Sequence, residues 1–287
     1  MSERHANTGT DTRPLVVTGA GGFVGGAVVA AFAGTRPVLA LARQAVTVPG
    51  TESVAADLAA GIPPAPGFRG AVVVHAAAAM GTQDRGNLWA ANVDATRRVA
   101  DWAVAHQAAL LIFISSGGVY PYERGRYWKE TDPVRPIGYY GHTKYLAEEL
   151  LRAYHGLDGL PVTVFRLFFP FGPGQTRGVA PFVSKAVREG TELTIQGPGE
   201  PRMNPVHVSD CVEAVRRVLS MGPGFRVYNL CGDRTVSFLD LVRAAEIEHG
   251  RKARTKSVPT GPGDLLGAND LLKNETGWTP RHPIPAG

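Results

Sequence analysis

Tyr140 and Lys144 are the two residues whose types and spacing most directly indicate chemistry. Residues four apart lie on one face of a helix, so the phenol and the ammonium group should point the same way. A nearby ammonium favours the phenolate and lowers the pKa of a tyrosine from its usual value of about 10. The pair therefore predicts a proton donor or acceptor that works near neutral pH, although an exposed pair without function has the same spacing.

Two serines, Ser115 and Ser116, end an apolar stretch over residues 110–115 that is typical of a buried strand. A serine hydroxyl at such a strand end can donate a hydrogen bond to a substrate oxygen. It can equally satisfy its own backbone at the start of a loop. At this point the sequence leaves both interpretations open.

A glycine-rich turn, TGAGGFVG at residues 18–25, lies between a short apolar run and an expected helix. Gly19, Gly22 and Gly25 recur at every third position. Such a turn lets the backbone approach a pyrophosphate, and the N-terminus of the following helix favours its negative charge. Val24 stands where the strict G-x-G-x-x-G motif has its last glycine, and a turn without a ligand is the alternative.

The end of the next expected strand, residues 38–42, bears on the choice of cofactor. NAD-binding proteins usually place an acidic residue there to bind the ribose 2′-hydroxyl, but this chain has Ala42 followed by Arg43. An arginine can pair with a 2′-phosphate through charge-assisted hydrogen bonds. We therefore expect NADP(H) to be favoured over NAD(H), with a solvated surface arginine as the alternative.

Apolar strands that alternate with helices must position these groups. The expected strands cover residues 15–17, 38–42, 71–75, 110–115 and 162–169, and the expected helices cover residues 23–33, 88–107 and 140–154. This alternation is typical of βαβ units and predicts an α/β fold with a Rossmann-type doubly wound parallel sheet. Ligands of such sheets bind at the carboxyl ends of the strands, where the glycine and serine turns fall.

The chain divides into two expected parts after a short leader. Residues 14–169 should form the dinucleotide-binding domain, with residues 206–232 packing back on it. Residues 170–205 and 233–287 should form a smaller substrate-binding lobe, because the pattern loosens there and glycine and proline become frequent. Residues 1–13 are expected to be a flexible leader.

Composition excludes several classes of protein. The chain has 287 residues, a net charge of +5 and two cysteines, and 44% of its residues are hydrophobic. Its scattered basic residues count against a nucleic-acid partner, and Cys211 and Cys231 lack the spacing of a zinc site, so no metal is expected. No apolar run reaches the roughly 18 residues of a membrane span, and the first 13 residues lack a secretory signal. We therefore expect a cytoplasmic protein with no membrane partner and a small-molecule substrate.

Together these motifs resemble the extended short-chain dehydrogenase/reductase family, in its nucleotide-sugar epimerase/dehydratase group. The resemblance covers nearly the whole chain from residue 14. It runs through TGAGGFVG at residues 18–25, VVVHAAA at 72–78, ISSGGVY at 114–120, YGHTK at 140–144, FGPG at 171–174 and NPVHVSD at 204–210.

The resemblance implies a role for many residues. Ser116, Tyr140 and Lys144 would be catalytic, with Tyr140 as the acid/base. The expected cofactor-binding residues, including Arg43 from the argument above, are Gly19, Gly22, Phe23, Val24, Gly25, Arg43, Asp57, Leu58, Ala76, Ala77, Ala78, Asn92, Ser115, Tyr140, Lys144 and Phe168. The expected substrate-binding residues are Met80, Gly117, Gly118, Phe169 and Arg202. A homodimer through the helices of residues 88–107 and 140–154 is implied as well.

Departures from the family pattern narrow the expected chemistry. Sugar 4,6-dehydratases of the family carry Asp-Glu where this chain has Gly117 and Gly118, so dehydration by that route is not expected. Family members also carry an Asn that contacts the substrate diphosphate where this chain has Phe169. Arg202 stands one residue further from His207 than the family spacing.

These observations favour an NADPH-dependent ketoreductase that acts on a nucleotide-linked keto-deoxysugar. A nucleotide-sugar epimerase that retains NAD uses the same catalytic residues and is the first alternative. A reductase of a non-sugar ketone or aldehyde is the second, because the aromatic residues at 168–171 suit a less polar ligand. A dinucleotide-sensing regulator on the same fold is the third.

Overall fold

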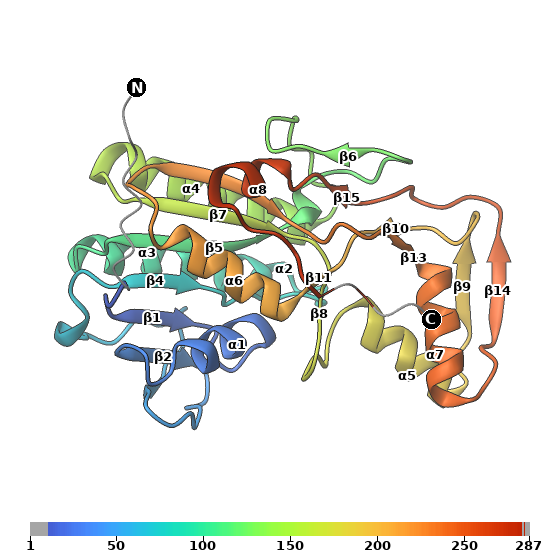
Figure 1. The fold of residues 1–287 in the computed structure, drawn as a ribbon, viewed down its shortest axis with the longest axis horizontal. Helices are drawn as coiled ribbons and strands as arrows, with labels where there is room; N and C mark the ends of the chain where they lie inside the picture. Colours follow the sequence, from blue (N-terminus) through green and yellow to red (C-terminus); the bar gives the residue numbers. More distant parts are fainter. Residues whose placement is uncertain (1–10, 283, 285–287) are drawn as a thin grey trace.

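A seven-stranded parallel sheet forms the centre of the molecule (Figure 1) in the computed structural model, which describes residues 11–282 and residue 284. The order across the sheet is β12-β7-β5-β4-β1-β2-β3. The strands are β1 (Leu15–Thr18), β2 (Val38–Ala42), β3 (Glu52–Ala55), β4 (Val72–His75), β5 (Leu110–Ser116), β7 (Val162–Leu167) and β12 (Phe225–Leu230). The predicted Rossmann-type α/β fold is confirmed, and residues 1–10 of the expected leader lie outside the described residues.

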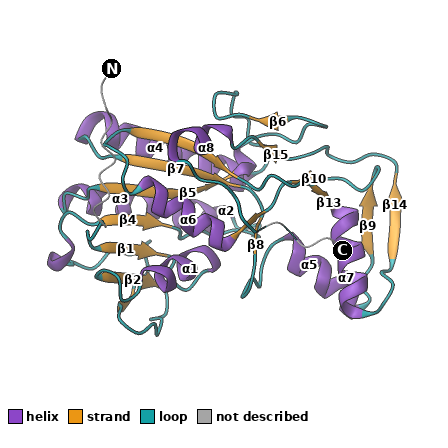
Figure 2. Cartoon of the chain, in the orientation of Figure 1, coloured by secondary structure: helices purple, strands orange, loops and turns teal. Residues whose placement is uncertain are grey.

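Helices cover both faces of this sheet (Figure 2). Helices α1 (Phe23–Phe32) and α6 (Val208–Val218) pack together on one face. Helices α3 (Ala95–Ala105) and α4 (Tyr139–Asp158) pack together on the other. Burial on both faces explains why the strands are apolar throughout.

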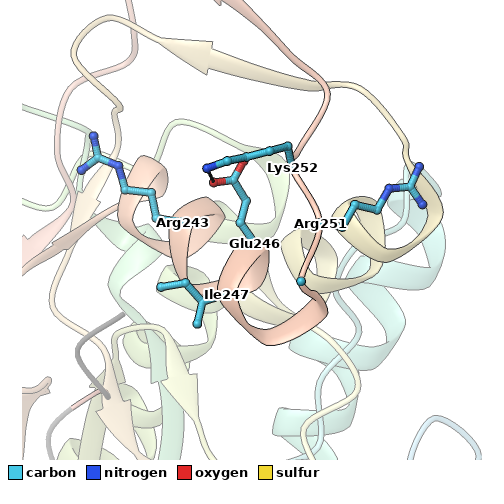
Figure 3. A pocket seen from close by; sticks show the side chains of 6 residues that line it. Arg243, Glu246, Ile247, Arg251 and Lys252 are labelled. Carbon is cyan, nitrogen blue, oxygen red and sulfur yellow. Dashed lines mark hydrogen bonds and ion pairs between the residues drawn. The ribbon is translucent and has the colours of Figure 1, made fainter.

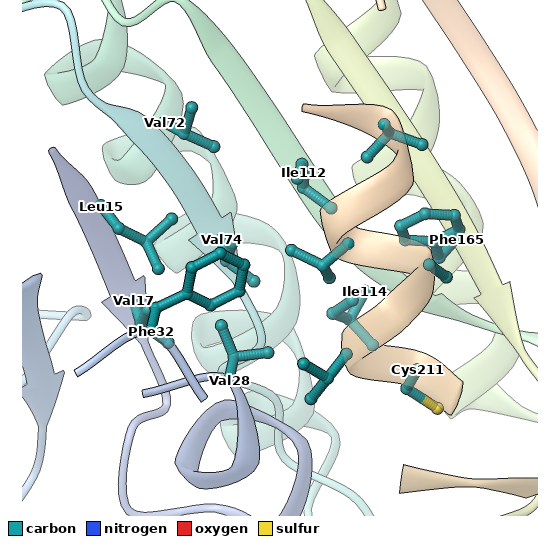
Figure 4. Packing of buried hydrophobic residues seen from close by; sticks show 14 of the residues in the cluster. Leu15, Val17, Val28, Phe32, Val72, Val74, Ile112, Ile114, Phe165 and Cys211 are labelled. Atoms are coloured by element: carbon teal, nitrogen blue, oxygen red, sulfur yellow. The ribbon is translucent and has the colours of Figure 1, made fainter. Parts of the chain in front are cut away.

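The two faces of each strand supply two separate hydrophobic cores. Because successive side chains of a strand point to opposite faces, Leu15 and Val17 pack in the core beneath α1 and α6, whereas Val16 packs in the core beneath α3 and α4. Figure 4 shows the first of these cores, with Val28 and Phe32 of α1 against the strand residues. All five side chains are at most 1% exposed, so this packing fixes the ends of the strands rigidly.

The register of the sheet aligns the carboxyl ends of its central strands. Thr18, the last residue of β1, pairs with Leu41 of β2 on one side and with His75 of β4 on the other. His75 pairs in turn with Phe113 of β5. The strand order reverses at β1, and such a switch point is where ligands bind in open α/β sheets.

The helix expected over residues 88–107 starts earlier and changes its winding. Helix α2 (Arg85–Trp89) runs through a π-helical turn, η2 (Ala90–Asp94), into α3. Asp84 caps α2 by accepting a hydrogen bond of 3.1 Å from the Asn87 amide. Single π turns are frequent at functional sites, and this one carries Asn92.

A smaller lobe lies beyond the carboxyl edge of the sheet (Figure 1). Its core joins helices α5 (Val179–Glu189) and α7 (Phe238–His249), and beside them β9 (Leu193–Gln196) pairs with β14 (Thr255–Val258). Short pairs connect it to the sheet: β8 (Pro170–Phe171) with β11 (Val206–His207), β10 (Arg202–Met203) with β13 (Val236–Ser237), and β6 (Tyr127–Trp128) with β15 (Leu266–Gly267). Two 3₁₀ turns, η1 (Pro66–Phe68) and η3 (Gly117–Val119), complete the connections.

The last described helix differs in position from the expectation. Residues 233–287 were assigned to the lobe, but Leu272 of α8 (Asp270–Thr276) and Trp278 are buried in the core beneath α1 and α6. The Trp278 indole donates a hydrogen bond of 2.9 Å to the Asp210 carbonyl of α6. These apolar side chains draw the segment back onto the sheet, next to the strand β12 that residues 206–232 contribute.

Candidate active site

Two glycines of the glycine-rich turn, Gly19 and Gly25, leave no room for a side chain. Gly19 follows β1 with a φ of +70°, and a Cβ there would come within 2.6 Å of the Ala77 nitrogen. A Cβ on Gly25 would collide with the Gly19 carbonyl oxygen. The Gly22 amide donates to that same oxygen at 2.8 Å. The turn therefore exposes backbone rather than side chains at the start of α1, the arrangement that a dinucleotide phosphate needs.

The start of α1 has the N–H groups that this arrangement requires. Gly22 is the N-cap residue, and no side chain in the described part of the protein caps this helix end. Phe23 and Val24 form its first turn and are partly exposed. These residues could hold the phosphates of a dinucleotide.

Arg43 lies directly after β2, beside the glycine-rich turn. Ala42 ends the strand, and a Cβ on Gly21 would be 3.6 Å from the Ala42 Cβ. The Arg43 side chain is exposed, and no hydrogen bond or ion pair to the described residues holds it. Its guanidinium group is therefore free to bind a ligand at this end of the turn.

The neighbouring strand ends supply the other expected cofactor residues. Asp57 is exposed, and its carboxylate accepts a hydrogen bond of 3.0 Å from the Ala59 amide. Leu58 packs on the core beneath α3 and α4. Ala77 lies against Gly19 together with Ala76, and Ala78, the next residue, is exposed.

Ser116 and Tyr140 are brought together by the packing of helix α4. A Cβ on Gly141 would collide with the Gly118 carbonyl oxygen, so this glycine lets the start of α4 approach the turn after β5. Burial raises the pKa of Tyr140, and a hydrogen bond with Ser116 lowers it by less. Ser116 Oγ also accepts a hydrogen bond of 3.0 Å from the Gly118 amide. The pair can bind and protonate one substrate oxygen.

The direction of the Tyr140 pKa corrects an expectation. The sequence predicted that Lys144 would lower it, but in the structure burial of the phenol outweighs every favourable contact. Burial also lowers the pKa of Lys144 to about 7, against a smaller rise from Glu148. A lysine that is partly neutral stabilises a phenolate less than an ammonium would.

Lys144 has the environment of a residue that waits for a ligand. Its side chain is 1% exposed, and its Nζ has no hydrogen-bond partner among residues 11–282 and residue 284. The Nζ lies 4.1 Å from the centre of the Phe113 ring and makes a cation–π contact with it. A buried donor without a partner is costly, and the hydroxyls of a nicotinamide ribose would satisfy it. The residues present therefore fit a nicotinamide dinucleotide.

Two expected cofactor residues make their polar contacts within the protein instead. Asn92 is fully buried, and its amide contacts the Ala79 backbone at 2.8 and 3.0 Å and the Thr143 hydroxyl at 3.0 Å. The Ser115 hydroxyl donates to the Glu148 carboxylate. Both side chains therefore position the site from behind.

Phe168 fills the space next to the turn after β5. Its side chain is 1% exposed, and a Cβ on Gly117 would come within 2.7 Å of its ring. A Cβ on Gly267 would meet the same ring at 2.8 Å. Position 117 therefore has no room for a carboxylate side chain unless Phe168 moves.

Among the expected substrate residues, Arg202 differs from the others in its surroundings. Met80 is 49% exposed and Phe169 is partly buried with an unusual φ of 43°, where a residue with a side chain is strained. Gly118 lies beside Ser116. Arg202 is different, because Asp264 holds its guanidinium with contacts of 2.7 and 3.0 Å in a separate hollow of about 270 Å³.

A second hollow, of about 480 Å³, lies at the end of α7 (Figure 3). Its lining residues are Arg243, Glu246, Ile247, Gly250, Arg251 and Lys252. None of the expected site residues lines it. Within the described residues no group of three or more His, Cys, Asp or Glu could hold a metal ion, and no helix is long and apolar enough to cross a membrane.

The sequence reasoning missed three buried polar residues behind the site. His75 ends β4 and is fully buried, and Glu148 and Arg166 form an ion pair of 2.8 Å between α4 and β7. Their signal was present, because His75 and Arg166 interrupt otherwise apolar strands and Glu148 follows Lys144 by one helical turn. Such residues are rarely buried without a partner.

Comparison with known proteins identifies the class of protein that this fold and site define. The family described as "NAD dependent epimerase/dehydratase family" matches residues 15–231. The chain therefore belongs to this family.

Two curated relatives show the range of the family. The chain is 31% identical over 253 residues to a dTDP-glucose 4,6-dehydratase of Streptomyces griseus, an alignment that covers 80% of this chain and 77% of that protein. It is 29% identical over 219 residues to UDP-glucose 4-epimerase 4 of Oryza sativa subsp. japonica, covering 67% of this chain and 59% of the relative. The chain spans about three fifths of the length of several of its curated relatives.

A solved structure resembles the whole chain. MoeE5 in complex with UDP-glucuronic acid and NAD superposes with a TM-score of 0.82, at 26% sequence identity and over 94% of both chains. The match includes the smaller lobe as well as the sheet, because it extends over nearly all of the protein.

Proposed function

We propose that this protein is an NADPH-dependent ketoreductase that reduces the carbonyl group of a nucleotide-linked keto-deoxysugar. The observation that carries the proposal is the contact of Ser116, at the carboxyl end of β5, with Tyr140 of α4. Lys144 lies one helical turn further along α4, and its Nζ has no hydrogen-bond partner among the described residues. The glycine-rich turn follows β1 in the same sheet. Similarity to a structure that holds a nucleotide sugar and NAD supports the class of substrate.

In this proposal the side chains handle the carbonyl oxygen. Ser116 donates a hydrogen bond to it, and Tyr140 gives it a proton as the carbonyl becomes an alcohol. The nicotinamide, when bound, supplies the hydride that the carbonyl carbon receives. Donors aimed at developing negative charge are typically the largest catalytic contribution, about 3 kcal/mol each. The raised pKa of Tyr140 keeps the phenol protonated and ready to donate.

Lys144 would bind the nicotinamide ribose and lower the pKa of Tyr140 once it is charged. Its own pKa of about 7 makes that charge sensitive to its surroundings. Hydrogen bonds that the ammonium donates to the ribose hydroxyl oxygens would replace part of the solvation that burial removes. The full acidity of Tyr140 therefore requires the bound cofactor.

The use of NADPH rests on Arg43. The Arg43 guanidinium is exposed, lies beside the glycine-rich turn and has no partner among the described residues. With Ala42 in place of an acidic residue at the end of β2, it suits a 2′-phosphate. The similar solved structure holds NAD, so the binding of NADPH and NADH to this protein must be compared directly.

The proposed reaction is tested with NADPH and a dTDP-4-keto-6-deoxyhexose, by following the nicotinamide absorbance. We expect absorbance to decay with the wild-type protein and at least about 100-fold more slowly with Tyr140→Phe, because the proton donor is lost. No decay with a panel of such substrates would overturn the sugar-reductase proposal.

An epimerase is the second candidate, supported by the similarity to the rice UDP-glucose 4-epimerase. It would oxidise and re-reduce one sugar carbon with the same three residues. The epimerase would be favoured over the reductase if the protein purifies with firmly bound NAD⁺ and inverts the configuration of one carbon of a UDP-hexose without consuming cofactor.

A further inference from the structure

A buried carboxylate, Glu148, lies one helical turn beyond Lys144 on the catalytic helix. It is 1% exposed and pairs with Arg166 of β7, which is 3% exposed. The Arg166 Nη2 and Nε contact one carboxylate oxygen at 2.8 and 3.1 Å. The Ser115 hydroxyl of β5 donates to the other oxygen. Both oxygens of this carboxylate therefore accept hydrogen bonds from neighbouring strands.

The same arginine extends the contacts across the sheet. Arg166 Nη1 donates to the Tyr120 hydroxyl at 2.5 Å, and that hydroxyl donates to Asn229 Oδ1 of β12 at 3.2 Å. Three strand ends and helix α4 are thus joined through one ion pair. Because Ser115 precedes Ser116, the pair also fixes the strand that carries the proposed oxygen-binding hydroxyl.

Glu148 is the acidic group among those that face Lys144. The titratable groups that act on Lys144 are His75 from β4 and Glu148 from α4 itself, and the Phe113 ring of β5 lies next to its Nζ. Burial keeps His75 neutral and holds its pKa at about 3, with a further lowering by the Lys144 charge. The ammonium therefore depends on Glu148 for a compensating charge.

Stability alone does not account for this arrangement. Replacing a buried ion pair with apolar residues of similar volume is often neutral or stabilising, because the charges lose their hydration. Here the carboxylate lies one helical turn beyond Lys144 on the same helix, and it accepts a hydrogen bond from the serine next to Ser116. Its position serves the site rather than the core.

We propose that Glu148, held by Arg166 and Ser115, is the positioning residue that supplies the negative charge facing Lys144 and fixes helix α4 on strand β5. The inference rests on the proposed role of Lys144. Glu148 acts through Lys144 and touches neither substrate nor cofactor. Its removal should change the ionisation of Lys144, which a merely structural residue would not do selectively.

The test is the titration of Lys144 by NMR after reductive ¹³C-methylation, with its signal assigned through Lys144→Arg. Glu148→Gln should move the midpoint down by about one pH unit, the effect of removing one nearby opposite charge. Glu149→Gln is the matched control, because Glu149 is the next residue of α4 and is exposed beside Arg152. It should leave the midpoint unchanged.

A second variant guards against a failure to fold. Glu148→Gln leaves Arg166 buried without its partner, whereas Glu148→Gln with Arg166→Gln removes both charges together. Lys144 should also titrate at lower pH in the double variant than in the wild type. Glu148 shares the helix of Lys144, whereas Arg166 approaches the carboxylate from β7. A midpoint equal to that of the wild type in either folded variant would overturn the proposal.

Cofactor binding separates this inference from the proposed function. The dissociation constant of NADPH, measured by fluorescence, should rise as the pH increases and Lys144 loses its charge. In Glu148→Gln this rise should begin at a lower pH than in the wild type. If the wild type binds no nicotinamide cofactor, the proposed function fails while the NMR titration still decides the role of Glu148.

Discussion

Thr18 and His75, at the carboxyl ends of the neighbouring strands β1 and β4, are joined by a hydrogen bond of 2.7 Å between Oγ1 and Nδ1. The other ring nitrogen contacts the Thr96 hydroxyl at 3.0 Å, and that hydroxyl donates to the Asn92 carbonyl. Because the Thr96 proton is already used, His75 Nε2 must donate and Nδ1 must accept. A neutral histidine therefore links the strand before the glycine-rich turn to the π turn of Asn92.

This histidine should make the protein sensitive to acid. Burial lowers the pKa of His75 from 6.5 to about 3. Between these values the unfolded chain binds a proton that the folded chain does not, so the free energy of unfolding falls as pH drops, by about 1.4 kcal/mol per unit. Denaturant unfolding of His75→Gln should lack this part of the slope.

His142→Gln, at an exposed residue of α4, is the control, and its profile should follow that of the wild type. Equal slopes for His75→Gln and the wild type between pH 6.5 and pH 3 would show that His75 does not stay neutral in the folded protein.

The glycine-rich turn predicts different results for two glycine-to-alanine variants. Gly19→Ala places a Cβ within 2.6 Å of Ala77 at a φ of +70°. We expect it to weaken NADPH binding at least about tenfold and to lower stability by about 1–3 kcal/mol. Gly34→Ala has a similar φ of +73° with nothing within 4 Å, so it should cost stability but leave binding intact. Equal NADPH binding by the two variants would contradict the proposal that the glycine-rich turn holds the cofactor.

Arg43 predicts the choice between the two cofactors. Arg43→Ala should weaken NADPH binding by roughly 10- to 100-fold, since a charge-assisted contact is worth about 1.5–3 kcal/mol, and should leave NADH binding nearly unchanged. Arg243→Ala, an exposed arginine of α7, is the control. If NADH binds more tightly than NADPH to the wild-type protein, Arg43 does not select the cofactor.

The expected homodimer predicts a change of mass. Trp89 of α2 and Leu146 of α4 are 42% and 43% exposed on neighbouring helices of one face. If this face forms the interface, Leu146→Lys should give a monomer by light scattering, because a buried unpaired charge is costly. Leu157→Lys, at an 85% exposed residue near the end of the same helix, should not. A monomeric wild-type protein would exclude the interface.

Local patterns in the sequence were sufficient for the apolar strands of the sheet and for the glycine-rich turn. The edge strand β3 was not predicted, because its residues are exposed or partly buried and show no apolar run. Apolar runs such as residues 110–115 became strands because burial on both faces demands it, and Gly19 takes the positive φ that its turn requires. These features depend on neighbours in the chain, which the sequence displays directly.

Contacts between distant residues were beyond reach. Arg166 is visible in the sequence as a charge within an apolar strand, but its partner Glu148 is set by how α4 packs across β5 and β7. Asp264 holds Arg202 from 62 residues away. The raised pKa of Tyr140 was likewise unpredictable, because burial of the phenol depends on that same packing.

Transfer of deuterium tests the central claim most directly. Wild-type protein would be incubated with a dTDP-4-keto-6-deoxyhexose and NADPH deuterated at the nicotinamide C4, and the product examined by mass spectrometry and NMR. We predict one deuterium at the former carbonyl carbon, with one NADPH oxidised for each product. Tyr140→Phe should form this product at least about 100-fold more slowly. An inverted sugar without net oxidation of NADPH would contradict the account and identify an epimerase.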